Sequence, residues 1–291
     1  MNRIGILALT MAAAAMPAAA QQRVDETKPA AKDGAVEVHN VAGSVRVTGW
    51  DQDQVAVTGT LGRGTERLEF TAGERRTVVR VVLPHNAHHV DGSDLEIKVP
   101  RGSSLEVNTV SADISADKVS GETVLESVSG GITVGGEPKR FTARTVSGDV
   151  DITAASAPGQ AKSVSGTVKL NGVTGDVEAG SVSGDISVKG DGISHVDLET
   201  TSGDIRLDAG LAKDGRVTAK TVSGTVELVL PAATSADFDV TTFSGHITND
   251  FGPEAKRTSE YGPGKELSFS TGTGGRIVAR SFSGNVHLRK K

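Results

Sequence analysis

A five-residue phrase, most often Val-Ser-Gly-Asp-Ile, returns at a nearly fixed interval through this 291-residue chain. Successive gaps between its third positions are 18, 18, 18, 18, 19, 21, 21 and 39 residues. Those positions are Ala112, Gly130, Gly148, Gly166, Gly184, Gly203, Gly224, Gly245 and Gly284. A fixed period of this size predicts a stacked repeat architecture. A weaker copy at Val119-Ser120-Gly121 lies halfway, so the elementary unit is close to nine residues, one short strand and its corner.

Each copy also alternates apolar and polar residues, the pattern of a strand with one buried face. In the copy from Thr145 to Ile152, strict alternation places Val146, Gly148, Val150 and Ile152 inside. The same rule places Phe141, Val182, Ile186, Val188, Ile205, Leu207, Val222, Val226, Leu228, Phe243, Val286 and Leu288 inside. The central glycine serves either a corner with positive φ or a coil too thin for a Cβ, and the Ser-Gly-Asp turn chemistry favours the corner.

We therefore predict an all-β, single-domain β-solenoid, a β-helix or β-roll of roughly 18-residue coils in either hand, with irregular β caps at both ends. Residues 1–20 are expected to form a signal peptide and 21–34 a disordered linker. Residues 35–103 form a capping β segment and 104–248 the regular coils. Residues 249–291 form a hairpin-like excursion and the last coil.

The signal-peptide prediction rests on Arg3, the apolar run from Ile4 to Met16 and the small residues before Gln21. The run is too short to span a bilayer. The chain has no Cys, which excludes disulfides and thiolate chemistry. Without Arg3, 30 Lys and Arg stand against 36 Asp and Glu, spread along the chain. This balance argues against nucleic acid or an anionic membrane as the main partner. We expect an exported monomer, periplasmic or at the cell surface, without stable membrane insertion.

Four phrases in order resemble the bacterial putative-adhesin family, a domain of unknown function. They are Val45 to Asp51, Leu95 to Gly102, the run of Val-Ser-Gly-Asp-Ile copies, and the stretch from Tyr261 to Gly284. The resemblance covers roughly residues 35–288. It implies a secreted or envelope β-solenoid with no assigned activity.

The repeat serines do not fit a catalytic nucleophile, which must be unique and paired with a base. They are Ser111, Ser129, Ser147, Ser165, Ser183, Ser202, Ser223, Ser244 and Ser283. We expect their hydroxyls to bond their neighbours or the corner backbone. The central coils also lack aromatic platforms and converging unlike charges, which a polysaccharide-cleaving site needs.

Two hypotheses of metal binding stay open as alternatives. Asp follows Gly in several copies, as in calcium-loaded β-rolls, but one carboxylate or none per corner falls short of the six to eight oxygens that calcium prefers. His85, His88, His89 and Asp91 form the densest group of possible zinc ligands, in a polar loop where such residues are expected anyway. The structural interpretation predicts that no metal and no cofactor is bound.

The sequence therefore favours a non-catalytic adhesin-type or envelope scaffold that presents a repetitive Ser, Thr and Asp surface to a protein or glycan. The alternatives are a polysaccharide-active β-helix enzyme and a calcium- or zinc-dependent β-roll. No residue is predicted to be catalytic. The repeat glycines, Gly130 to Gly284, are predicted to be structural.

Overall fold

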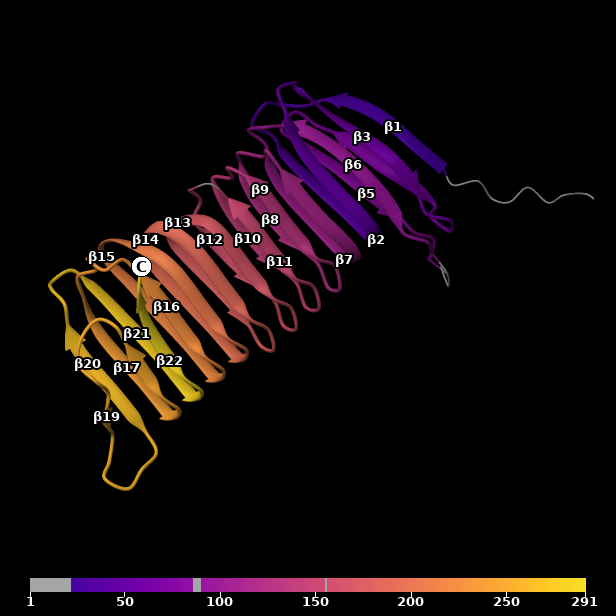
Figure 1. Ribbon diagram of the computed structural model, residues 1–291. Coiled ribbons are helices and arrows are strands. Elements are labelled where there is room, and N and C mark those ends of the chain that lie inside the picture. The colour runs from indigo at the N-terminus through magenta and orange to yellow at the C-terminus, as the bar shows by residue number, and fades with distance from the viewer. Residues whose placement is uncertain (1–21, 86–89, 155) are drawn as a thin grey trace, which may run out of the picture.

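The computed structural model describes residues 22–85, 90–154 and 156–291, and these residues form strands, turns and loops without a helix. The predicted signal peptide lies outside the described residues. Strands stack side by side along an elongated body (Figure 1). The described part of the chain is therefore all-β and solenoid-like, which confirms the coarse fold prediction.

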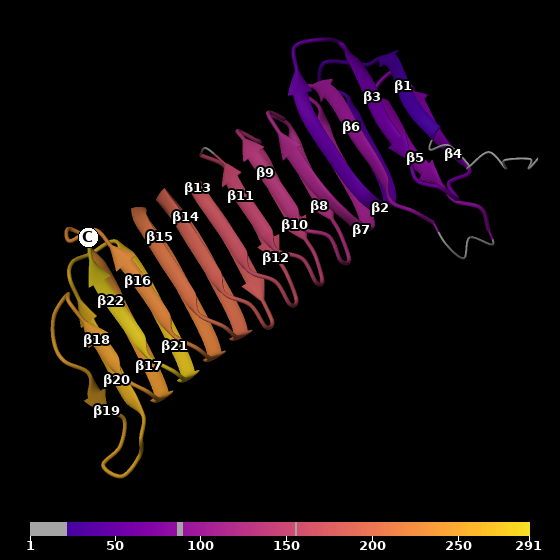
Figure 2. The ribbon, with the colours of Figure 1, turned by 45° about the vertical axis from the view of Figure 1, so that its right-hand side comes forward.

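The central coils are built from β7 to β14, whose bounds are Ser104–Asp117, Glu122–Glu126, Ile132–Gly136, Arg140–Arg144, Val150–Ala154, Gly159–Lys162, Val168–Ser181 and Ile186–Ser202. Each coil places one strand before its Val-Ser-Gly corner and one strand after it. Phe141 of β10 pairs in parallel with Thr123 of β8 and Gly159 of β12, while Val150 of β11 pairs with Ile132 of β9 and Val168 of β13. The strands thus form two parallel sheets, here named the pre-corner sheet and the post-corner sheet (Figure 2).

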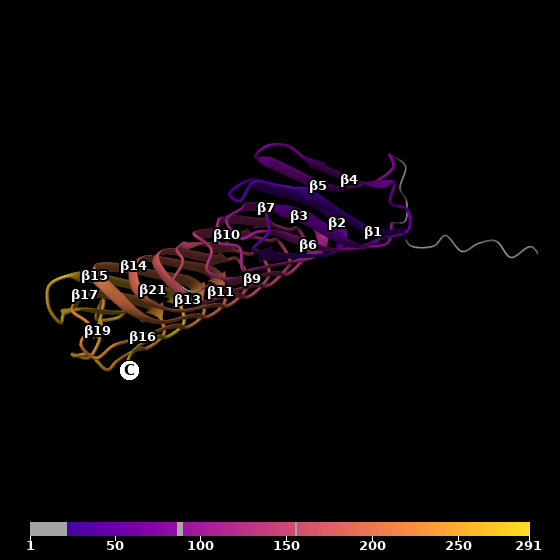
Figure 3. The same cartoon turned by 90° about the horizontal axis from the view of Figure 1, so that it is seen from above.

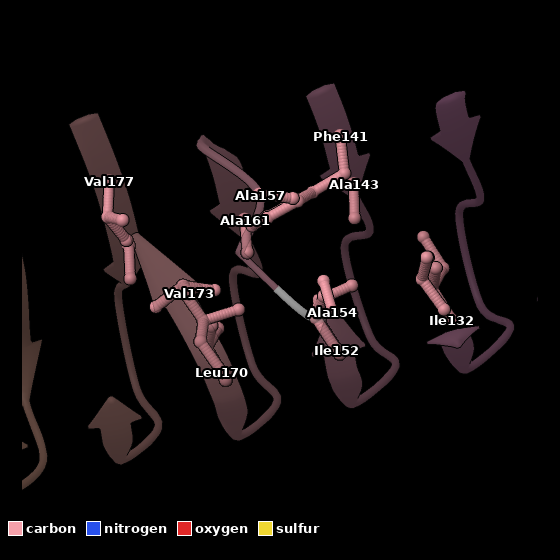
Figure 4. Packing of buried hydrophobic residues seen from close by; sticks show 14 of the residues in the cluster. Ile132, Phe141, Ala143, Ile152, Ala154, Ala157, Ala161, Leu170, Val173 and Val177 are labelled. Atoms are coloured by element: carbon pink, nitrogen blue, oxygen red, sulfur yellow. The ribbon is translucent and has the colours of Figure 1, made fainter. Parts of the chain in front are cut away.

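Apolar side chains from both sheets meet between them in a narrow core (Figure 4). Phe141 and Ala143 point inward from the pre-corner sheet, and Val150 and Ile152 from the post-corner sheet; all four are 0% exposed. Predominantly small and β-branched residues fill this space because the two sheets leave room for about one side chain from each. The core positions predicted on the post-corner strands are confirmed from Val150 to Leu288.

Four residues that alternation placed inside are instead exposed, namely Val146, Val182, Val222 and Phe243, at 44%, 47%, 52% and 52%. The reason is that the chain turns between two strands at this point. Thr145 and Gly148 are both buried, and the two residues between them are both exposed. Alternation therefore restarts after each corner, and the prediction was wrong at every corner apolar residue.

The N-terminal segment contains β1 to β6, with bounds Gln22–Pro29, Ala35–Trp50, Gln54–Leu61, Arg67–Ala72, Arg76–Val82 and Ser93–Pro100. Strand β2 is itself a coil, since its two halves pair in parallel with β7. Beyond it, β3 pairs antiparallel with β6, and β4 with β5, so the two sheets end in separate antiparallel extensions (Figure 3).

The predicted disordered linker, residues 21–34, is wrong over most of its length. Residues Gln22–Pro29 form strand β1, which runs antiparallel to β3 and ends with Pro29 opposite Gln54. Val24 in the middle of the strand is 8% exposed. The polar composition suggested a linker, but the open edge of β3 offers a full row of backbone partners, which orders even a polar strand.

The C-terminal strands β15 to β22 span Ile205–Ser223, Val226–Leu230, Ala236–Ser244, Ile247–Asn249, Lys256–Arg257, Lys265–Ser270, Gly275–Ser283 and Val286–Lys290. Here spatial order departs from sequence order. Strand β21 pairs in parallel with β15 on one side and β17 on the other, and β22 likewise lies between β16 and β18. The last coil of the sequence is therefore inserted between two earlier coils. The excursion continues the pre-corner sheet as antiparallel β20 and β19.

Candidate functional site

The repeat glycines are explained by close approach. A Cβ built on Gly148 would lie 2.0 Å from the carbonyl oxygen of Gly130, and one on Gly166 would lie 1.9 Å from that of Gly148. A Cβ built on Gly130 or on Gly184 would likewise lie 2.0 or 2.1 Å from a carbonyl oxygen of the preceding coil. None of these four has a positive φ. The favoured corner explanation was wrong for them, because the stacked corners leave no room for a side chain.

A buried ladder of hydroxyl groups holds these corners together. The Thr145 hydroxyl donates to the Gly130 carbonyl at 3.0 Å, and the Ser163 hydroxyl donates to the Gly148 carbonyl at 2.9 Å. The ladder consists of Thr109, Ser127, Thr145, Ser163, Ser181, Thr200, Thr221, Thr242 and Ser281. Its members satisfy carbonyl groups that would otherwise be buried without a partner. Sequence reasoning missed this ladder, although a Ser or Thr stands immediately before the exposed corner residue in every one of these copies.

The predicted serine ladder has a different role. The repeat serines from Ser111 to Ser283 are all exposed. Among the described residues, no hydrogen bond joins any of their hydroxyl groups to another group, whereas the amide of Ser147 donates to Val128 at 2.9 Å. The expectation that these hydroxyls bond the corner backbone was wrong, since the residue two positions earlier does so. The serines form a polar row on the outside of each corner.

The repeat aspartates bond the backbone of the next coil. Oδ1 of Asp149 accepts the amide of Thr167 at 2.7 Å, and Oδ1 of Asp204 accepts that of Thr225 at 2.7 Å. Asp113 and Asp185 make the same contact at 2.8 Å. The aspartates therefore link neighbouring coils. Within the described ranges, no three His, Asp or Glu side chains are grouped so as to hold a metal.

The histidine loop is only partly described. His85 lies at a turn after β5, and His88 and His89 lie outside the described residues. The Asp91 carboxylate accepts a hydrogen bond from Nε of Arg63 at 2.6 Å, and this contact also raises the pKa of Arg63. Asp91 therefore has an ion-pair partner, and its metal role stays an untested prediction.

The exposed corner residues form a straight apolar stripe along one edge of the body, here named the corner edge. Its members are Val41, Val110, Val128, Val146, Val164, Val182, Val222, Phe282 and Phe243. Successive corners stack directly, because the amide of Val146 donates to the carbonyl of Val128 at 3.2 Å and that of Val164 to Val146 at 3.3 Å. An apolar surface of this extent marks an interaction site more often than a solvent-facing surface.

Two shallow grooves lie beside the corner edge, on the outer side of the pre-corner sheet. The first, of about 540 Å³, has Val146, Val164 and Val182 along one wall. The second, of about 550 Å³, has Val222, Phe282 and Phe243 along the same wall. Glu199 lines both grooves, so they adjoin end to end.

Charges in the first groove are largely paired. Arg144 contacts Glu126 at 3.1 Å, and Lys162 contacts Glu178 at 2.5 Å. The hydrogen bond from Lys162 is the main cause that lowers the pKa of Glu178, against a smaller effect of burial in the other direction. Such pairs, exposed by nearly half, position side chains more than they stabilise the fold. The groove offers an apolar wall and a charged floor, an arrangement suited to binding.

The chain belongs to a repeat class of all-β proteins, because it consists of parallel coils with glycine corners. Its outer edge carries both polar and apolar residues. The model of one family, Toastrack DUF4097, matches residues 30–211 and 194–289. The chain belongs to this Toastrack DUF4097 family, consistent with the resemblance to a putative-adhesin family of unknown function. A comparison with curated protein sequences finds no significant match.

Solved structures similar to the chain share little sequence with it. A putative lipid binding protein from Parabacteroides distasonis is 12% identical, with 91% of this chain and 97% of that one covered and a TM-score of 0.49. A putative adhesin from Bacteroides fragilis is also 12% identical, with 92% and 97% covered and a TM-score of 0.45. A putative adhesin from Parabacteroides merdae is 10% identical, with 92% and 97% covered and a TM-score of 0.37. These resemblances are too distant to indicate a ligand.

Proposed function

We propose that this protein is an exported, non-catalytic adhesin-type module, a single-domain β-solenoid capped at both ends. Its corner edge binds a protein or a glycan of the cell envelope. The observation that carries the proposal is the unbroken stacking of exposed Val and Ser along the corner edge, from Val110 to Val182. A rigid periodic edge favours binding through many weak, equivalent contacts.

The surroundings of the edge support binding over catalysis. The Ser hydroxyls repeat equivalently along the edge, and within the described part of the chain none is hydrogen-bonded to a base, whereas a nucleophile needs one distinct base and an oxyanion site. The Asp carboxylates face the backbone amides of the next coil. Among the described residues, no helix is long and apolar enough to cross a membrane. We keep the division into residues 35–103, 104–248 and 249–291 as part of this proposal, with β1 added to the N-terminal cap.

The test compares two double variants of the purified protein. Val128→Lys with Val164→Lys adds two charges to the corner edge, and Thr133→Lys with Thr153→Lys adds the same charges to the exposed face of the post-corner sheet. Binding to intact cells, isolated envelope protein and envelope glycan is measured for each. We expect the corner variant to lose at least about tenfold in affinity, because each Lys must be desolvated against the partner. Equal binding by both variants would refute the proposal.

The two rival functions are tested on the same protein. Release of reducing ends from acidic polysaccharides would establish the glycan-active enzyme in place of the scaffold. A large fall in melting temperature with a chelator would establish the metal-dependent β-roll, because metal binding contributes directly to folding.

A further inference from the structure

The corner edge changes character at its C-terminal end. The other corners carry Val, except for Thr201 between Val182 and Val222, but the two neighbouring corners here carry Phe282 and Phe243, which are 57% and 52% exposed. Their rings stack with centroids 4.9 Å apart and planes 7° from parallel. Val222 of the adjoining coil is 52% exposed and extends this surface. Two exposed, ordered aromatic rings beside a groove are a strong indication of a ligand.

The floor of the second groove is cationic. Lys220, Arg280 and Lys265 line it, and Glu199 is the single acidic residue in its lining. Lys220 is the direct partner of Arg280 of β21 on one side and of Glu199 of β14 on the other, so it has one neighbour of like charge and one of opposite charge. Among the described residues, neither Lys220 nor Lys265 has an ion pair, and Arg280 reaches Asp239 only at 3.7 Å. The floor therefore carries more positive than negative charge.

The C-terminal region that borders the second groove also has a net positive charge. Residues 249–291 contain eight Lys and Arg against four Asp and Glu, within a chain whose net charge is −5. The even spread of charge expected from the sequence is thus wrong at this end. A local excess of positive charge raises the concentration of anions near the groove.

The excursion borders the second groove at one end, and the first groove adjoins it at the other. Strand β20 pairs antiparallel with β17, with Lys265 opposite Thr242, and Thr258 and Gly264 of the same excursion line the groove. In the other direction the groove continues past Glu199 toward Val182. Coils repeat at about 4.8 Å, so the wall from Phe243 through Phe282 and Val222 to the Thr201 corner is about 15 Å long. One acyl chain spans about half of a 30 Å bilayer core, which is the same length.

We propose that this groove binds a single-chain anionic amphiphile, a fatty-acid carboxylate. Its head is held by Lys265 and Arg280, which flank β17 at the end of the groove bordered by the excursion, and its chain lies along Phe243, Phe282 and Val222 toward the coil of Lys220. An extended peptide is a poorer fit, because β15, β21 and β17 beneath the groove are already paired on both sides and leave no backbone groups for it. This binding goes beyond the adhesin-type function and does not depend on it.

The direct test is calorimetric titration of the purified protein with dodecanoate below its micellar concentration, at low salt. We expect one dodecanoate per chain. Acetate, which has the head alone, and dodecyltrimethylammonium, which has the chain with the opposite charge, should bind at least about tenfold more weakly. Equal binding of the two surfactants would overturn the proposal as non-specific detergent binding. Binding confined to anionic phospholipid vesicles would overturn it in favour of a membrane-surface site.

Matched variants locate the site. Lys265→Gln with Arg280→Gln, and separately Phe243→Ser with Phe282→Ser, should each weaken dodecanoate binding at least about tenfold. The control variant, Lys169→Gln with Lys189→Gln, removes two exposed lysines from the post-corner sheet. Its dodecanoate affinity should stay within about twofold of the wild-type affinity. Circular dichroism melts verify that each variant is folded. Unchanged binding in either groove variant would overturn the proposal.

The Val128→Lys, Val164→Lys variant separates this proposal from the adhesin-type function. Both substitutions lie outside the second groove. That variant should lose envelope binding and retain dodecanoate binding, so either proposal can fail while the other stands.

Discussion

The central coils and the C-terminal coils use the same corner but stack in different orders. In the central part, each strand pairs with the next coil along the chain, as Val150 does with Val168. At the C-terminal end, Thr218 of β15 pairs with Val278 of β21, and Val278 in turn pairs with Asp239 of β17. The chain therefore returns to fill a space between two coils that it has already formed. Sequence period reports the size of a coil, whereas spatial order depends on which edges remain open.

Deletion of residues 275–291 should give the largest effect. It removes β21 and β22, which lie between β15–β16 and β17–β18, so β17 and β18 lose the strands that pair with them in parallel (Figure 1). We expect residues 236–270 to unfold locally, with a loss of several kcal/mol from this end. Limited trypsin digestion should then cleave at Lys256 and Arg257 far faster than in the intact protein.

Deletion of residues 22–29 is the matched comparison. It removes β1, which pairs with β3 alone at the outer edge. The coils should keep their resistance to trypsin, because no internal partner is lost. Equal resistance of residues 236–270 with and without β21 and β22 would contradict the inserted coil.

The substitution Gly148→Ala should give the second-largest loss of stability. Its Cβ would meet the Gly130 carbonyl oxygen at 2.0 Å, so the stacked corners must move apart. We expect a loss of about 3 kcal/mol, typical of overpacking in a site that cannot relax. Gly192→Ala is the control, because its φ is +65° and nothing lies within 4 Å of the new Cβ. That change should cost only about 1 kcal/mol, the strain of a left-handed residue.

Urea unfolding of both variants distinguishes the two explanations for glycine in this chain. A larger loss in Gly192→Ala than in Gly148→Ala would mean that conformation, and not close approach, sets the cost.

The sequence was sufficient for the all-β repeat and for most of the buried positions. Periodicity is a property of neighbouring residues, so the burial of Val150 and Ile152 could be predicted from it directly. The exposure of Val146 and Phe243 could not, because the corner breaks alternation inside a single phrase. The position of β21 depends on pairing between distant segments, which the 39-residue gap alone does not specify.

The candidate groove was missed for the same reason. Strict alternation places Phe243 in the interior, so it does not predict the stacked pair with Phe282 at the surface. The cations reach one floor from β15, β21 and β20, three segments that only the inserted coil brings together.

Thr145→Val should have a moderate effect on the central coils. The Thr145 hydroxyl donates to the Gly130 carbonyl at 3.0 Å, and Val keeps the shape while it leaves that buried carbonyl without this donor. We expect a loss of about 1–2 kcal/mol in urea unfolding. Ser147→Ala, two residues later at the exposed side of the same corner, should stay within about 0.5 kcal/mol. Similar losses in both variants would mean that the buried and the exposed hydroxyl groups both stabilise the corner.

The ion pair of the first groove should give the smallest effect, and its sign is fixed by the lowered pKa of Glu178. A carboxylate whose pKa is lowered in the folded protein stabilises it above the ordinary pKa and loses that contribution as the pH falls through the lowered value. The hydrogen bond from Lys162 is the main cause. Because the two side chains are 44% and 46% exposed, the contribution stays below about 1 kcal/mol.

Urea midpoints of the wild type and Glu178→Gln, measured at pH 7 and near pH 2, test this. The wild type should be slightly more stable at pH 7, and the difference should shrink in acid. Glu122→Gln, on an exposed carboxylate of the same sheet without an ion pair in the described structure, should show little difference at either pH. A difference for Glu178→Gln that grows in acid would mean that the groove holds this carboxylate protonated. The Glu178 carboxyl group would then be neutral, which contradicts its ion pair with Lys162 in the first groove.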